Sequence, residues 1–203
     1  MRPDRGLAAA LLLLAAAMLV GCTSRPLSNT EDLCKIFKER PRWYRAALAS
    51  EERWRIPTPV MMAVVNKESS YVARARPPRD RLLWVIPWKR SSSAYGFAQA
   101  TDEAWSDYLR ETGNRSADRD DFADAIDFVG WYLNRSHRHL NIAAEDARAL
   151  YLTYYAGMGG YQRGTWRNNE WLKDAAVRVA TRATRYERQL TSCRGLDRRR
   201  GWF

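Results

Sequence analysis

The chain has 203 residues, of which 46% are hydrophobic and 28% charged, and its formal net charge is +11. This length allows one domain with a substantial core and is too short for two comfortable ones. The positive charge favours an acidic partner, although 34 basic residues set against 23 acidic ones also fit arginines that only solvate helix faces.

The first residues are predicted to be a targeting segment and not part of the fold. Arg2 and Arg5 precede an unbroken apolar run over residues 7–20, and Leu19-Val20-Gly21-Cys22 resembles the bacterial lipobox, which is cleaved before a cysteine that then receives lipid. A transmembrane anchor is the alternative, but the run is shorter than the ~20 apolar residues that a span needs. We therefore expect a signal peptide over residues 1–21 and a lipid anchor on Cys22.

An exported lipoprotein has no access to nucleic acid, so its acidic partner is expected among envelope polymers and anionic lipids. By analogy with bacterial lipoproteins, Thr23 in place of an aspartate after Cys22 predicts the periplasmic face of the outer membrane. Residues 22–30 are polar and turn-forming, which indicates a lipidated tether. The remaining residues, 31–203, are expected to form one domain.

Apolar periodicity predicts helices through most of this domain, and no alternating strand or hairpin is evident, so the predicted fold class is all-α. The expected helices cover residues 42–54, 58–70, 101–112, 120–140, 143–155 and 169–191. Residues 74–93 are the exception, because their prolines and arginines exclude a long helix while Leu82 to Trp88 is too apolar for an ordinary loop. We expect an irregular apolar insertion that forms a lid, dips into the membrane surface or packs on the body.

The helix over residues 58–70 carries the candidate catalytic group. Thr58 is expected to cap it and Pro59 to occupy its first position. Glu68 falls at i+4 from Val64, on the apolar stripe, near the negative end of the helix dipole. Both settings disfavour the ionised carboxyl, so Glu68 is predicted to be an acid that stays protonated near neutral pH. The alternative is a side chain that frays out to solvent.

Two later stretches decide between these alternatives. Gly96-Phe97-Ala98-Gln99 places a glycine shortly before an amide, and Thr153-Tyr154-Tyr155-Ala156-Gly157 ends an apolar helix in aromatics and glycine. With Glu68-Ser69, this order of motifs over roughly residues 40–190 resembles the soluble lytic transglycosylases, lysozyme-like enzymes that cut the glycan strands of peptidoglycan.

The resemblance implies a lysozyme-like single domain that cleaves the β-1,4 bond between N-acetylmuramic acid and N-acetylglucosamine. In that family one glutamate, here Glu68, acts as acid and then as base while a 1,6-anhydro ring closes, and no metal or other cofactor takes part. Peptidoglycan would be the partner, and other envelope proteins stay open as partners. The substrate-binding residues that it implies are Ser69, Tyr95, Gly96, Gln99, Tyr154, Tyr155 and Tyr186.

The chain also departs from the family pattern. Tyr155 replaces an asparagine, Phe97-Ala98 replaces Leu-Met, and the interval from Glu68 to Gly96 is long. Two alternatives therefore stay open: a glycan-binding envelope lipoprotein that does not turn over, and a hydrolytic lysozyme in which Asp102 or Glu103 supplies the second carboxylate.

Cys34 and Cys193 are the two cysteines besides Cys22, and they lie near the two ends of the domain. In an oxidising compartment we expect them to form a disulfide that joins the termini. A metal site with His137 and His139 is the alternative, but two lone histidines at a helix end are more typical of a surface.

Overall fold

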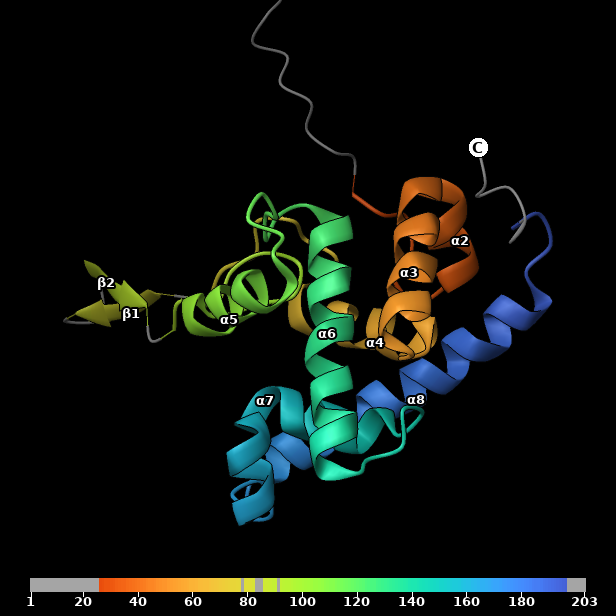
Figure 1. Ribbon diagram of the computed structural model, residues 1–203. Coiled ribbons are helices and arrows are strands. Elements are labelled where there is room, and N and C mark those ends of the chain that lie inside the picture. Colours follow the sequence, from red (N-terminus) through yellow and green to blue (C-terminus); the bar gives the residue numbers. More distant parts are fainter. Residues whose placement is uncertain (1–25, 78, 83–85, 91, 197–203) are drawn as a thin grey trace, which may run out of the picture.

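The computed structural model describes residues 26–77, 79–82, 86–90 and 92–196 (Figure 1). Within these ranges the chain forms seven helices and one two-stranded sheet, so the all-α prediction is confirmed. The helices are α2 (Leu33–Glu39), α3 (Pro41–Trp54), α4 (Thr58–Ser69), α5 (Asp102–Thr112), α6 (Phe122–Leu140), α7 (Ala147–Arg163) and α8 (Glu170–Ser192). No helix in these ranges is both long and apolar enough to cross a membrane. The predicted signal peptide and Cys22 lie outside the described residues.

Helix α4 lies at the centre of the core. Every residue from Val60 to Asn66 is buried, because α3, α6 and α8 all pack against this helix. A helix that is apolar around its whole circumference is stable only when it is enclosed in this way. The single apolar stripe expected from the sequence therefore understates the burial of α4, and only its last turn carries polar side chains towards the surface.

The start of α4 differs from the prediction. Thr58 is the first helical residue and Pro57 precedes it as the N-cap residue, without a side-chain cap. The free backbone N–H of Thr58 donates instead to Oε2 of Glu51 on α3, at 3.0 Å, and the Thr58 hydroxyl donates to the carbonyl oxygen of Ala47. The cap comes from a neighbouring helix, and a local motif could not predict it.

The other helix ends follow their local signals. Thr101 accepts a hydrogen bond from the backbone N–H of Ala104 and begins α5, which ends at Gly113 in the left-handed conformation. Asp121 and Asn169 cap α6 and α8 in the same way. Asp146 caps α7, which begins at Ala147, four residues after the expected start, and ends at Arg163. Short side chains that bond the first turn account for these boundaries.

Helix α2 was not predicted, and its position explains the joining of the termini. Cys34 on α2 forms a disulfide with Cys193 at the end of α8, with Cα atoms 5.7 Å apart, which confirms the predicted pair and overturns the metal-site alternative for these cysteines. Beside it, Glu31 forms ion pairs with Arg182 and Arg185 of α8. The first residues of the domain are therefore attached to its last helix.

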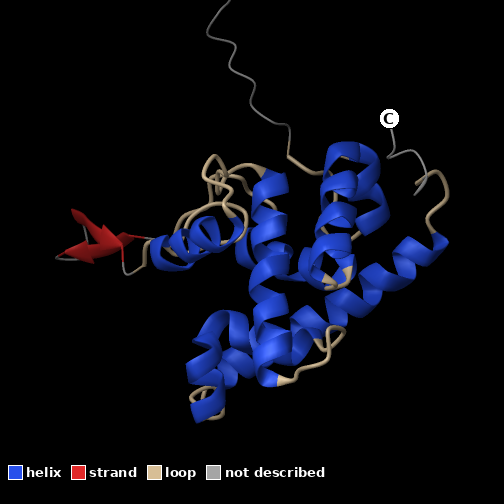
Figure 2. Ribbon diagram, viewed as in Figure 1, coloured by secondary structure: helices blue, strands red, loops and turns tan. Residues whose placement is uncertain are grey.

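The insertion contains a hairpin, so the expectation of an irregular segment without strands is wrong. Strands β1 (Arg79–Leu82) and β2 (Ile86–Arg90) pair antiparallel, with a register shift between Arg79 and Arg81. Pro87 lies within β2, which is possible because both strands of a two-stranded sheet are edges and tolerate proline. Figure 2 shows the strands standing apart from the helical body, beyond α5, and not packed on the body.

Candidate active site

Glu68 lies in the last turn of α4, where that helix leaves the core. The side chain is partly buried. Burial raises the pKa of the Glu68 carboxyl to about 7, against an ordinary value of 4.5, and a hydrogen bond from Tyr151 and the charge of Lys67 offset only part of this rise. A carboxyl with a pKa near 7 can both give and take a proton at neutral pH. The raised pKa is the property expected from the helical stripe, and the catalytic role of Glu68 remains a prediction.

Two tyrosines of α7 face this carboxyl. The Tyr151 hydroxyl forms a hydrogen bond with Glu68, and burial, together with the nearby Glu68 charge, raises the pKa of Tyr151. The same two causes raise the pKa of Tyr154. Both phenols therefore stay protonated, and Tyr151 is the one that bonds the carboxyl. Tyr151 was missed by the sequence analysis, although its position three residues before Tyr154 puts it on the same helical face.

The second motif forms a tight loop that is held by its own side chains. Gly96 has φ +82°, and a Cβ at this position would lie 2.0 Å from the carbonyl oxygen of Arg119, so only glycine fits. The side-chain amide of Gln99 donates to the carbonyl oxygens of Ala75 and Gly96, both at 2.9 Å. The Gln99 amide thus ties the loop to the chain that leaves α4. Its predicted contact with substrate remains a prediction.

One hydrogen bond joins the second and third sequence motifs. The Tyr154 hydroxyl donates to the carbonyl oxygen of Ala98 at 2.6 Å. The charge of Glu68, in the first motif, also acts on Tyr154 and raises its pKa. Helix α7 then breaks at Gly157, which has φ 71° and ψ 158°. The Glu68 turn, the Gly96 loop and the part of α7 before Gly157 therefore form one cluster.

Two of the predicted substrate-binding side chains form hydrogen bonds within the protein. The Ser69 hydroxyl donates to the carbonyl oxygen of Val65 in its own helix, at 3.2 Å. Tyr186 is fully buried behind α4, where its hydroxyl accepts a hydrogen bond from the Asn66 amide at 2.9 Å. Because the Tyr186 side chain has no exposed surface, its position gives no support to the predicted substrate contact.

The chain matches a known protein-family model. The model described as the transglycosylase SLT domain matches residues 10–193, which is most of the chain and includes all three motifs. The chain belongs to the transglycosylase SLT domain family. No curated protein matches the chain. No solved structure matches it either. Membership gives the domain its lysozyme-like class and a general association with peptidoglycan as substrate.

In this SLT domain, Tyr95 lies on the side of the Gly96 loop that faces α6. The Tyr95 hydroxyl donates to Oδ2 of Asp120 at 2.9 Å, and the guanidinium carbon of Arg76 lies 4.1 Å from the ring centroid. Tyr95 also lines a cavity of about 360 Å³ together with Asp102 and Arg119. The residue thus belongs to a charged pocket beside the loop, and its contact with substrate remains a prediction.

The candidates for a second carboxylate lie at the start of α5. Asp102 is exposed and forms an ion pair with Arg119, with Oδ1 and Nη1 2.8 Å apart, and Glu103 is exposed in the same turn. The pKa of Glu68 responds to burial, to the Tyr151 hydroxyl and to the charge of Lys67. In the residues that the structure describes, no group of three or more His, Cys, Asp or Glu side chains is placed to hold a metal ion.

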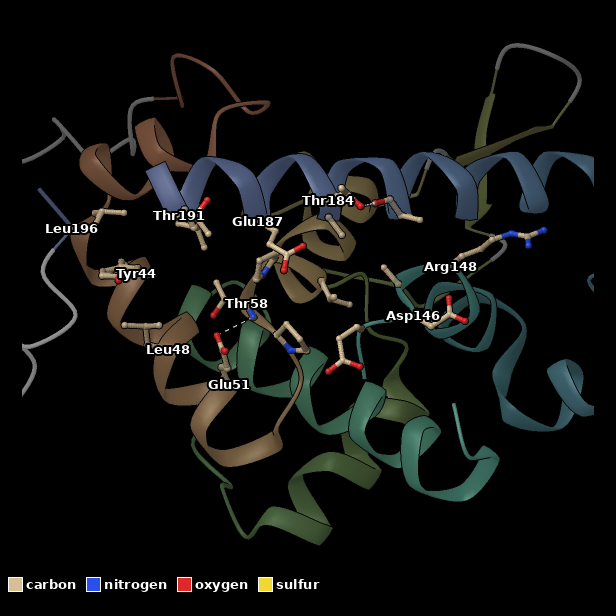
Figure 3. Close-up of a pocket in the computed structure, with 18 residues that line it drawn as sticks. Tyr44, Leu48, Glu51, Thr58, Asp146, Arg148, Thr184, Glu187, Thr191 and Leu196 are labelled. Carbon is tan, nitrogen blue, oxygen red and sulfur yellow. Dashed lines mark hydrogen bonds between the residues drawn. The ribbon is translucent and has the colours of Figure 1, made fainter. Parts of the chain in front are cut away.

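A cavity of about 560 Å³ lies at the opposite end of α4, among α3, α8 and the start of α7 (Figure 3). Glu51, Thr58 and Glu187 are among the residues that line it. Ten residues of helix, or about 15 Å, separate Thr58 from Glu68. None of the predicted site residues lines this cavity, so it is separate from the candidate active site.

Proposed function

We propose that this SLT domain is a lytic transglycosylase that cleaves the β-1,4 bond between N-acetylmuramic acid and N-acetylglucosamine, with Glu68 as its single acid and base. The observation that carries the proposal is the Glu68 carboxyl, whose pKa of about 7 results from burial at the end of the central helix. A group that must first donate and then accept a proton works best when its pKa is close to the working pH.

In the first step the protonated Glu68 gives its proton to the glycosidic oxygen, and the bond from that oxygen to the muramyl C1 breaks. The N-acetyl group of the same muramyl residue stabilises the positive charge that develops at C1. In the second step the Glu68 carboxylate takes the proton of the muramyl C6 hydroxyl as its oxygen bonds to C1. The 1,6-anhydro ring closes, Glu68 regains its proton, and no water is consumed.

The neighbours of Glu68 support this route over the two-carboxylate route of hydrolytic glycosidases. Tyr151 supplies a neutral hydrogen-bond donor that stabilises the carboxylate formed after the first step. Asp102, the candidate second carboxylate, is exposed and paired with Arg119. These neighbours favour a single-glutamate mechanism over hydrolysis with a second carboxylate.

The test is digestion of purified peptidoglycan by the full chain in detergent, with the released muropeptides analysed by mass. We expect products lighter by one water than the hydrolysed species. Glu68→Gln should release muropeptides at least about 100-fold more slowly than wild type. Asp102→Asn and Glu103→Gln serve as matched controls and should keep the activity. Reducing products that disappear with either control variant would indicate a lysozyme. Binding without release by the wild-type chain would indicate a glycan-binding module.

We further propose that Cys22 carries the lipid that attaches the domain to the periplasmic face of the outer membrane. The lipobox-like sequence before Cys22 and the apolar run over residues 7–20 support this proposal. In a bacterial host, the wild-type chain should fractionate with outer membranes and show an acylated N-terminal peptide by mass. Cys22→Ala should lose this acylated peptide, and its retention would contradict the proposal.

A further inference from the structure

Two aromatic rings are exposed beside the candidate active site. Tyr155 on α7 is 52% exposed and Trp171 at the start of α8 is 51% exposed, which is unusual for side chains of this size. Their ring centroids are 5.3 Å apart, and the planes are tilted by 56°. The two rings thus form a single small apolar surface across two helices.

The third member of this surface is a cation. The Lys67 ammonium nitrogen lies 5.0 Å from the centroid of the Trp171 ring, which is within the range of a cation–π contact. Within the ranges that the structure describes, no carboxylate forms an ion pair with Lys67. The ammonium group therefore remains available for an anion on a bound molecule.

This surface is next to the catalytic carboxyl. Lys67 directly precedes Glu68 in α4, and its charge acts on the Glu68 carboxyl. Tyr155 follows Tyr154 directly and lies one turn after Tyr151, on which it also acts electrostatically. A ligand that covers Tyr155 and Trp171 is therefore a near neighbour of the group held at Glu68.

We infer that Lys67, Tyr155 and Trp171 form a subsite that binds a carboxylated sugar of the glycan strand. This inference rests on the proposed function. The two rings offer an apolar face against which the C–H face of a pyranose packs, and the ammonium pairs with a carboxylate on that sugar's substituent. The carboxylate belongs either to the stem peptide or to the free lactyl group of a strand without peptides. Tyr155, where the family pattern has asparagine, contributes ring surface to this subsite in place of an amide.

Steady-state cleavage tests the two rings. We expect Trp171→Ala and Tyr155→Ala to raise KM for peptidoglycan about five- to twentyfold while kcat changes less than twofold, because each removes ring contact and leaves Glu68 in place. Trp171→Phe should recover part of the loss. Val177→Ala, which removes an exposed apolar side chain from the same helix, is the matched control. Unchanged KM in both ring variants, with normal wild-type activity, would overturn the subsite and leave the proposed function standing.

Binding tests the cation separately from turnover. The full chain carrying Glu68→Gln is titrated with peptide-bearing strands, with amidase-stripped strands that expose lactyl carboxylates, and with neutral chitin oligosaccharides. Adding Lys67→Gln should weaken binding to at least one carboxylated ligand about fivefold and leave the neutral one unchanged. A loss only for peptide-bearing strands would assign the carboxylate to the peptide, and a loss only for stripped strands to the lactyl group. Equal effects on all three would overturn the role of Lys67. Because this assay needs no cleavage, it decides the subsite even if wild type proves inactive.

Discussion

The Tyr154 hydroxyl donates a hydrogen bond to the carbonyl oxygen of Ala98, at 2.6 Å, and so joins the middle of α7 to the Gly96 loop. These two residues are 56 positions apart in the chain, and each belongs to a different sequence motif. The charge of Glu68 also acts on the Tyr154 phenol and raises its pKa, so Tyr154 lies close to that carboxyl as well.

Tyr154→Phe should therefore weaken both the fold and the site. Loss of the donor leaves the Ala98 carbonyl without this partner, and we expect the free energy of unfolding to fall by about 1–2 kcal/mol. Activity on peptidoglycan should fall as well. Urea unfolding and muropeptide release are the measurements. Tyr161→Phe, on the same helix, is the control, and equal effects in both variants would show that the Ala98 contact has no special role.

The free energy of unfolding should depend on pH because the pKa of the Glu68 carboxyl is raised in the folded chain. The pKa of Glu68 is about 7 in the folded chain and ordinarily 4.5. The contribution of Glu68 to the free energy of unfolding is therefore fully present below pH 4.5 and is lost as the pH rises through 7. Glu68→Gln does not titrate. It should match wild type near pH 4 and exceed it by up to about 3 kcal/mol at pH 8. Urea unfolding at both pH values measures the difference. Glu52→Gln, which changes an exposed carboxyl on α3, should show no such pattern.

Tyr151 should set the pH range of activity. Its hydrogen bond lowers the pKa of Glu68, so Tyr151→Phe should raise that pKa and move the loss of kcat/KM at alkaline pH to higher pH. The maximal rate should fall at the same time, because the carboxylate formed after the first step loses a donor. A pH profile of muropeptide release, compared with Tyr132→Phe, measures both effects. If the loss of kcat/KM at alkaline pH occurs at the same pH in Tyr151→Phe as in wild type, this role for Tyr151 is excluded.

Gly96 and Gly113 allow the effect of space to be separated from the effect of backbone angle. Both have positive φ, but a Cβ on Gly96 meets the Arg119 carbonyl oxygen at 2.0 Å while a Cβ on Gly113 meets nothing within 4 Å. Gly113→Ala should cost about 1 kcal/mol of stability through strain alone. Gly96→Ala should cost at least about 3 kcal/mol and abolish activity. Thermal or urea unfolding of the pair provides the test, and similar losses would contradict the close approach.

The disulfide should be a large contributor to stability. Cys34 and Cys193 are 159 positions apart, and in the chain-entropy model closing so long a loop contributes about 5 kcal/mol, although measured values often fall between 2 and 5. The double Cys→Ser variant should therefore unfold at lower urea concentration. Reductant should lower the midpoint of wild type and leave that of the variant unchanged.

Much of the fold followed from short-range signals, because caps and apolar periodicity act within one turn. Thr101 and Gly113 bounded α5 as expected. The capping of Thr58 by Glu51 did not follow, since the donor and acceptor come from different helices. The hairpin was missed because its two strands do not alternate apolar and polar residues.

The candidate site was predictable in its central residue and less so around it. Glu68 stood out because a carboxyl sat on an apolar stripe. Tyr151 and Trp171 did not, because their significance depends on how α8 packs against α4 and α7 packs against α8. Gln99 was recognised from its motif, but its two bonds to backbone carbonyls belong to a loop whose shape a pattern of residues does not reveal.

The attachment of the first residues to α8 has a mechanical consequence. Glu31 is held by Arg182 and Arg185, the backbone N–H of Leu33 donates to Gln189, and Cys34 is bonded covalently to Cys193. A force applied to the chain ahead of these residues would reach a covalent bond before it reached α3 or α4. Unravelling from the N-terminal side would stop at Cys34, and the helix that carries Glu68 would keep its shape while the domain is pulled.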